Sequence, residues 1–126
     1  SLVRYKLQHY PIGNKRFSYE FNWLGKINKH NQLIVTRNCA FEPSDPSLKN
    51  WSEHCLNEIQ NAFFWHKPAV ISTHRVNYVG GIDKKNADSG LRKLEIFLKE
   101  IILRWPNVEF ITSNELSEII RMDKNN

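Results

Sequence analysis

The fold depends on residues 67–81, which read KPAVISTHRVNYVGG. A short apolar run, residues 69–71, lies between a proline and a series of polar residues, which is typical of a buried strand in a parallel sheet. The polar residues that follow this strand are Ser72, Thr73, His74, Arg75 and Asn77. Two glycines then let the backbone turn. Because ligands meet the carboxyl ends of parallel strands, these polar residues are the first candidates for a functional site.

A second apolar run, residues 32–36, predicts another buried strand earlier in the chain. It is followed by Arg37 and Asn38, and then by a loop with two prolines that contains Glu42 and Asp45. If the two strands run parallel, these four polar residues lie on the same rim of the sheet as His74. The alternative is that they only cap the loop, with a local pairing of the arginine with a carboxylate.

Two long amphipathic segments flank the central strand. Pro46 and Ser47 are predicted to open a helix that runs to about Trp65. Its apolar residues recur at helical spacing and predict a core stripe. They are Trp51, Cys55, Leu56, Ile59, Ala62 and Phe63. A second helix follows residues 83–89 and ends before Pro106 and Asn107. Its predicted apolar side consists of Leu91, Leu94, Phe97, Leu98, Ile101, Ile102 and Trp105.

The last segment is predicted to hold a third strand and a third helix. Residues 108–111 form a short apolar run. Residues 112–115, which read TSNE, match a capping box for a helix over residues 116–122. The tail, residues 123–126, is expected to be frayed.

The predicted order is therefore strand, helix, strand, helix, strand, helix. This alternation favours an α/β protein with right-handed crossovers, forming a partial (β/α) barrel or a small parallel sheet. We expect three parts: residues 1–31 as a basic, aromatic-rich segment, residues 32–122 as the βαβαβα part, and the tail. A partial barrel leaves sheet edges and an apolar face uncovered, so we expect the chain to self-associate.

The N-terminal segment carries all of the net charge of +5. Residues 1–31 contain six Lys and Arg residues against Glu20 alone, whereas the remainder holds 12 basic and 12 acidic residues. The basic residues are Arg4, Lys6, Lys15, Arg16, Lys26 and Lys29. Alternating aromatic residues over 17–23 predict a half-buried strand, and residues 11–14 predict a turn before it. A basic, aromatic segment favours contact with an anionic polymer. The alternative is a solvated segment that packs its rings on a neighbouring part of the fold.

Composition excludes several classes. The chain is 40% hydrophobic and 25% charged, which is typical of a globular protein and not of a disordered one. No apolar run approaches the about 20 residues that span a bilayer, so we expect no membrane span. The two cysteines, Cys39 and Cys55, form no CxxC pattern and are predicted to be small buried residues.

The chemistry of the predicted rim centres on His74. Histidine is suited to general acid or base catalysis because its unperturbed pKa lies near neutrality. Arg37 is suited to holding an anion, and Asp45 or Glu42 to orienting the histidine. The sequence contains no P-loop, GxGxxG, GxSxG, HExxH or HxxxH pattern. A freestanding metal-independent hydrolase is a weaker interpretation, because no nucleophile is paired with His74.

Three stretches resemble the C-terminal part of bacterial polysaccharide deacetylase-like proteins, the NodB-homology class of carbohydrate esterases. They are QLIVTRNCAFEPS at residues 32–44 with Trp51, KPAVISTHRVNY at residues 67–78, and WPNVEFITSNEL at residues 105–116. The likeness covers about residues 24–121. This family has a distorted (β/α) barrel and a divalent metal, usually zinc, bound by an aspartate and an HxxxH pair. It removes N- or O-acetyl groups from sugars.

The resemblance implies roles for particular residues. His74 matches the histidine on a late strand that protonates the leaving amine or alcohol. The candidate substrate-binding residues are Arg37, Asn38, Glu42, Asp45, Trp51, Arg75 and Asn77. The chain departs from the family pattern in two respects. It has no counterpart of the aspartate base or of the HxxxH pair, and the usual Leu-His-Asp is Thr73-His74-Arg75.

These departures lead to the expectation that the chain is the C-terminal portion of a longer protein. The intact protein is expected to bind zinc and act on acetylated polysaccharide, whereas these residues alone are expected to bind no metal or cofactor and to be inactive. The alternative function is a binding module whose basic N-terminal segment contacts an anionic polymer or a protein partner.

Overall fold

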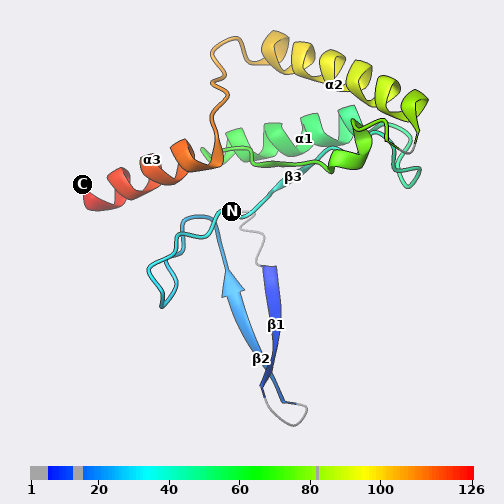
Figure 1. The fold of residues 1–126 in the computed structure, drawn as a ribbon. Coiled ribbons are helices and arrows are strands. Elements are labelled where there is room, and N and C mark those ends of the chain that lie inside the picture. The colour runs from blue at the N-terminus through cyan, green and yellow to red at the C-terminus, as the bar shows by residue number, and fades with distance from the viewer. Residues whose placement is uncertain (1–5, 13–15, 82) are drawn as a thin grey trace. The chain divides into compact units, whose positions relative to one another are not determined.

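The computed structural model describes the backbone of residues 6–12, 16–81 and 83–126, and the side chains of residues 22–81 and 83–126. Helices and strands both occur in these residues, so the mixed α/β class is confirmed (Figure 1). The chain divides into two units. Residues 37–109 form one, which we call the site unit because every candidate site residue belongs to it. Residues 1–36 and 110–126 form the other, which we call the terminal unit.

The site unit contains a two-stranded parallel sheet. β3 (Cys39–Ala40) pairs with β4 (Ile71–Ser72), with Cys39 opposite Ile71 and Ala40 opposite Ser72. α1 (Trp51–Phe64) lies between these strands in the sequence, which gives the predicted strand–helix–strand order. The parallel relation of the two strands is therefore confirmed, in a small sheet; in the part of the chain that is described, the sheet does not extend into a partial barrel.

The predicted strand at residues 32–36 is wrong, because a local turn captures this segment. The Asn28 side chain accepts hydrogen bonds from the backbone N–H groups of His30 and Gln32. The backbone of Ile34 then pairs with Gly25 and Lys26. These bonds bring the apolar run back onto residues 25–28 of the terminal unit, with an antiparallel bridge between Ile27 and Leu33. A turn that forms locally therefore outcompetes a parallel pairing that must wait for a distant strand.

The predicted third strand at residues 108–111 is also not formed. Its flanking N–H groups are used by turns: Val108 donates to the Trp105 carbonyl, and Thr112 donates to the Glu115 side chain. Val108 packs against the core, whereas Phe110 and Ile111 are exposed. The backbone N–H groups at both ends of this short segment are therefore bonded in a turn and in a helix cap, and few remain for pairing with a strand.

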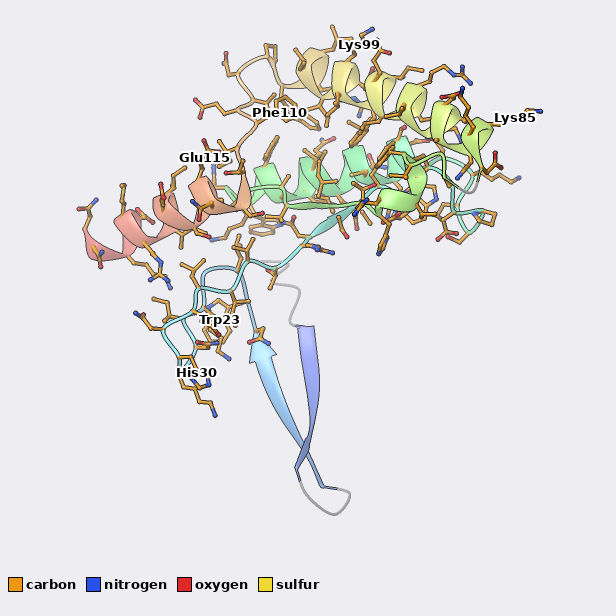
Figure 2. The ribbon with its side chains drawn as sticks, viewed as in Figure 1. Trp23, His30, Lys85, Lys99, Phe110 and Glu115 are labelled. Atoms are coloured by element: carbon orange, nitrogen blue, oxygen red, sulfur yellow. The ribbon has the colours of Figure 1, made fainter. Side chains whose placement is uncertain are left out.

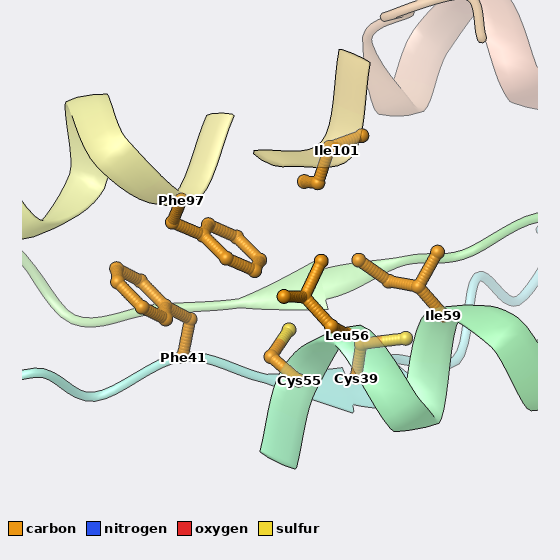
Figure 3. Packing of buried hydrophobic residues seen from close by; sticks show 7 residues of the cluster. All are labelled: Cys39, Phe41, Cys55, Leu56, Ile59, Phe97 and Ile101. Carbon is orange, nitrogen blue, oxygen red and sulfur yellow. The ribbon is translucent and has the colours of Figure 1, made fainter. Parts of the chain in front are cut away.

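The core of the site unit lies between α1, α2 (Lys84–Arg104) and the β3–β4 pair, as Figure 3 shows. Its buried residues are Cys39, Phe41, Cys55, Leu56, Ile59, Phe97 and Ile101. The rings of Phe41 and Phe97 stack with centroids 4.3 Å apart. Trp51 and Phe63 pack against this core, and Ala62 is buried, so the predicted stripe on α1 is confirmed. Burial of each large side chain of this kind stabilises the fold by about 1.5–3 kcal/mol.

The predicted apolar side of α2 is only partly correct. Phe97 and Ile101 are buried, and Leu94, Leu98 and Trp105 pack against them, but Leu91 and Ile102 are about half exposed. The difference arises because a narrow stripe of α2 is covered within the site unit, so residues beside that stripe face outward.

The helix boundaries follow from their caps. α1 begins at Trp51, later than predicted, because the Asn50 side chain accepts a hydrogen bond from the Glu53 N–H. Asp83 caps α2 through the N–H groups of Lys85 and Asn86. The capping box of α3 (Ser113–Asn125) is confirmed, with Thr112 and Glu115 bonded reciprocally. α3 extends beyond the predicted end at Met122, so residues 123–125 are helical and not a frayed tail.

The terminal unit holds an antiparallel hairpin. β1 (Lys6–Ile12) pairs with β2 (Arg16–Asn22), with Lys6 opposite Asn22 and Ile12 opposite Arg16. The strand predicted near residues 17–23 is therefore confirmed, and its predicted half-burial lies outside the described side chains. Of the predicted turn, residues 11 and 12 belong to β1, and residues 13 and 14 lie outside the described residues.

Within the same unit, α3 contacts the loop that follows β2. Arg121 donates to the Asn31 carbonyl over 3.2 Å, and Lys124 donates to the Gly25 carbonyl. Gly25 has a φ of +83°, a conformation that favours glycine. Figure 2 labels Trp23 and His30 on this loop. Among the described helices, none combines the length and apolar composition needed to cross a bilayer.

Candidate functional site

The candidate site lies where the chain leaves the two parallel strands. β3 is followed by Phe41 and Glu42, and β4 is followed by Thr73 and His74. The backbone N–H of Phe41 donates to the Ser72 carbonyl over 2.9 Å, which keeps the two exits together beyond the strands. Because the strands are parallel, Glu42 and His74 leave the sheet at the same edge. The predicted common rim is therefore formed for these two residues.

Glu42 and His74 form a carboxylate–histidine pair. The Nδ1 atom of His74 lies 2.6 Å from Oε1 of Glu42. The second carboxylate oxygen, Oε2, accepts hydrogen bonds from the His74 backbone N–H at 3.3 Å and from the Asn77 amide at 2.7 Å. Since a carboxylate only accepts, Nδ1 is the donor and carries a proton. Both oxygens of Glu42 are thus used to hold one orientation of the imidazole.

The two members of this pair differ in exposure. The His74 side chain is 71% exposed, whereas the Glu42 side chain is 14% exposed. The carboxylate is therefore shielded and fixed, while the ring is open to solvent on its other side. With Nδ1 bound to Glu42, Nε2 is the nitrogen that can exchange a proton with a ligand. This arrangement is suited to general acid–base catalysis.

Asn77 lies beneath the pair and is 1% exposed. It belongs to a short 3₁₀ turn, Arg75–Asn77. Its amide nitrogen donates to Glu42 and to the His74 carbonyl, and its oxygen accepts from the Ser44 N–H at 3.1 Å. The structure therefore places this predicted substrate-binding residue in the interior, with both ends of its amide bonded to the protein.

The two predicted arginines lie on the exposed side of the site unit. A guanidinium nitrogen of Arg37 donates to the Ser72 hydroxyl over 3.3 Å, which places it beside β4. Arg75 directly follows His74 in the 3₁₀ turn and is exposed. Both side chains are accessible to a ligand, as the prediction requires.

Asn38 is placed at the other end of the strand pair. Its Oδ1 accepts from the Val70 N–H at 2.6 Å, and its Nδ2 donates to the Pro68 carbonyl at 2.9 Å. These bonds join the segments that precede β3 and β4. The structure therefore does not bring Asn38 together with His74, and its amide closes the amino end of the sheet.

Asp45 and Trp51 organise the loop after Glu42. The Asp45 carboxylate accepts from the Ser47 N–H, and this bond, together with the Ser47 hydroxyl, lowers the pKa of Asp45. The Trp51 indole donates to the Asp45 carbonyl over 2.8 Å. For Asp45 the loop-capping alternative describes the observed contacts, and the predicted substrate-binding residue Trp51 is bonded to the same loop.

Three residues that support the site were not predicted from the sequence: Gly90, Lys93 and Tyr78. Gly90, in the middle of α2, lies against the 3₁₀ turn, and Lys93 of the same helix donates to the Pro43 carbonyl over 3.1 Å. The hydroxyl groups of Thr73 and Tyr78 are 2.6 Å apart, and burial raises the pKa of Tyr78. A glycine inside a helical pattern is a recognisable signal of close packing, and Gly90 had that signal.

The described side chains include histidines, cysteines and carboxylates, which are common metal ligands. They contain no group of three or more His, Cys, Asp and Glu residues arranged to hold an ion. Cys39 and Cys55 are free thiols, both buried as predicted, and they belong to the core.

The predicted basic segment lies largely outside the described side chains, including Arg4, Lys6, Lys15 and Arg16. In the described part, Trp23 is 42% exposed and the Lys26 ammonium lies 5.1 Å from the centre of its ring. Lys29 is exposed on the same loop. These residues place one aromatic ring and two cations in the terminal unit.

Comparisons of the chain with protein-family models, with curated proteins and with solved structures found no match.

Proposed function

We propose that this chain carries the acid–base histidine of a carbohydrate deacetylase-like hydrolase, which removes acetyl groups from a polysaccharide. The single observation that supports this proposal most is the 2.6 Å contact between Nδ1 of His74 and a shielded Glu42 carboxylate. An imidazole held in this way presents Nε2 outward at the carboxyl edge of a parallel sheet. The resemblance of residues 32–44, 67–78 and 105–116 to polysaccharide deacetylases supplies the reaction class.

The proposed step uses His74 and Glu42 only. With Nδ1–H donated to Glu42, the lone pair of Nε2 accepts a proton from solvent water, and the adjacent carboxylate stabilises the resulting imidazolium. The Nε2–H then donates its proton to the leaving amine or alcohol as the bond from that nitrogen or oxygen to the acetyl carbon breaks. Proton transfer of this kind contributes about 10²–10⁴-fold to a rate.

The proposal assigns metal binding to a segment outside residues 1–126, because the sequence contains no counterpart of the family's HxxxH pair. A divalent metal such as zinc supplies an activated water as nucleophile when it is bound. This chain supplies the proton donor and a wall of the substrate site, including Arg37 and Arg75. We therefore expect the chain alone to release no acetate from an acetylated oligosaccharide in the presence of zinc.

The test uses a longer protein that contains this chain. The polypeptide upstream of residue 1 is expected to contain an aspartate pair and an HxxxH sequence. With zinc and an acetylated oligosaccharide, that protein should release acetate, and His74→Gln should lower kcat by about 100-fold or more. His66→Gln, a histidine of the same unit beyond the end of α1, is the matched control and should leave kcat unchanged. Full activity of the His74 variant, or acetate release by the chain alone, would refute the proposal.

A second function has one specific observation in its favour. The exposed Trp23 ring and the Lys26 ammonium lie in the unit that also contains the basic N-terminal segment. We propose as the alternative that this unit binds an anionic polymer through cations and a stacking ring. Binding to heparin should then weaken as salt rises and should be lost when Arg4, Lys6, Lys15 and Arg16 are changed to Gln.

The control for the heparin experiment changes the same number of cations in the site unit. Lys67, Lys84, Lys85 and Arg92 are exposed there, and Figure 2 labels Lys85 on α2. Their replacement by Gln lowers the net charge equally, so an equal loss of binding would show a general effect of charge and would exclude a specific interface.

A further inference from the structure

The Asn77 amide connects the three segments that build the acid–base pair. Its nitrogen donates to Oε2 of Glu42 at 2.7 Å and to the His74 carbonyl at 2.9 Å. Its oxygen accepts from the Ser44 N–H at 3.1 Å. One buried side chain therefore holds the carboxylate, the backbone of the histidine and the loop that follows the carboxylate.

The bonding pattern requires an amide at this position. An aspartate has the same shape and would still accept from Ser44, but it places a second carboxyl group against Glu42. Ionised, it has no donor, and protonated, it has one O–H in place of the two N–H groups that serve Glu42 and the His74 carbonyl. A leucine would leave the Ser44 N–H and one oxygen of Glu42 without this partner in the interior. Since a buried polar group without a partner is costly, only Asn fits all three bonds.

The position of Asn77 is set by the helix behind it. A Cβ atom built on Gly90 would lie 1.8 Å from the Asn77 carbonyl oxygen and 2.9 Å from its carbonyl carbon. No flexible side chain can yield there, because the contact is with backbone. One turn further along α2, Lys93 donates to the Pro43 carbonyl over 3.1 Å. The same face of α2 thus fixes both the turn that carries Asn77 and the loop that carries Glu42.

We propose that Asn77 is a positioning residue that keeps Glu42 against Nδ1 of His74, and that the close approach of Gly90 places Asn77 for this task. The consequence is a single neutral tautomer of His74, with the proton on Nδ1 and Nε2 free for a ligand. The catalytic importance of that tautomer rests on the proposed acid–base function, but the tautomer itself is a property of the folded chain.

The experiment measures the ¹⁵N chemical shifts of the His74 ring in the full chain at a pH where the ring is neutral, with assignment by His74→Gln. The wild type should show the Nδ1–H tautomer. Asn77→Asp and Gly90→Ala should each lower the ratio of Nδ1–H to Nε2–H by about tenfold, because a hydrogen bond to a charged group is lost or lengthened. Gly81→Ala is the matched control and should leave the ratio unchanged, since a Cβ there meets no atom within 4 Å.

Two results would overturn the inference: a wild-type ratio in folded Asn77→Asp and Gly90→Ala, or an equal change in Gly81→Ala. If Asn77→Asp does not fold, Gly90→Ala decides, because alanine is the better helix former and only the turn that carries Asn77 must move to admit its Cβ atom. A tautomer shift in these variants without acetate release by the longer protein would uphold the positioning role and refute the proposed reaction.

Discussion

At each end of the β3–β4 pair, a polar side chain from the β3 segment bonds to the β4 segment, but the two contacts differ in what they bind and how exposed it is. At the amino end, Asn38 reaches from the first segment to the backbone of Pro68 and Val70. At the carboxyl end, Glu42 reaches from the first segment to His74. Asn38 meets backbone groups and the neighbouring Cys39 thiol, so its bonds are made within the fold. Glu42 binds Nδ1 of an exposed imidazole and so leaves the other ring nitrogen, Nε2, open to solvent. The difference is that the cross-strand contact at the amino end is part-buried, whereas the contact at the carboxyl end includes a side chain that is 71% exposed.

Removal of the amino-end contact should have the largest effect on stability. Asn38→Ala leaves the part-buried Val70 N–H and Pro68 carbonyl without this partner, at a cost of about 1–3 kcal/mol for each group. We expect the free energy of unfolding in urea to fall by about 3 kcal/mol, while the His74 tautomer stays unchanged. Asn57→Ala, on the exposed face of α1, is the control and should have little effect. A tautomer change in Asn38→Ala would show that the two ends are not independent.

Self-association should depend on the outer face of α2, whose inner face supports the site. Leu103 is 75% exposed, and Ile96 and Ile102 also face outward. We expect Leu103→Lys to weaken a dimer or larger oligomer by at least about tenfold, because a buried leucine contributes about 1.5–3 kcal/mol. Sedimentation at several concentrations measures this. Lys99→Gln is the control, because Lys99 is an exposed residue of α2 one turn before Leu103; Figure 2 labels Lys99 on this helix. A monomeric wild type at high concentration would contradict the expectation.

Alkaline pH should lower the free energy of unfolding because of the buried Cys55 thiol, which contacts Cys39 at the start of β3. The hydrogen bond with Cys39, followed by burial, raises the pKa of the Cys55 thiol. The folded state therefore keeps this proton where the unfolded state, with a pKa near 9.0, loses it. Stability is fully present below that value and falls as pH rises above it, by about 1.4 kcal/mol per pH unit. Urea unfolding at about pH 8, 9 and 10 measures the free energy of unfolding. It should fall more steeply with pH in the wild type than in Cys55→Ala.

The parallel strand pair could be predicted from the sequence pattern, whereas the exact start of its first strand could not. The apolar run before His74 and the helix between the strands predicted a parallel pair, and that prediction is confirmed. A common rim for Glu42 and His74 follows from that parallel relation. Asn38 was assigned to the same rim because it follows the same predicted strand. The strand lies later, at Cys39–Ala40, so Asn38 precedes it and faces the other end.

The remaining features depend on contacts that a pattern does not contain. Residues 32–36 are apolar and β-branched, yet the Asn28 side chain turns them back locally. Asn77 was predicted to meet substrate because it follows His74 closely. Its burial depends on α2, which approaches only because residue 90 lacks a Cβ atom. Alternation therefore predicted the strand–helix–strand unit and the two later helices, but two of the predicted strands did not form, and single side chains decided which polar groups are exposed.

The most direct test of the central claim compares the ring ¹⁵N shifts of neutral His74 in the wild type and in Glu42→Gln. We expect the Nδ1–H tautomer in the wild type, because the Glu42 carboxylate can only accept a hydrogen bond and Nδ1–H must donate it. We expect the Nε2–H tautomer in the variant, because the introduced amide can accept from Asn77 and donate to Nδ1. The same tautomer in both proteins would show that Glu42 does not hold the imidazole and would contradict the account.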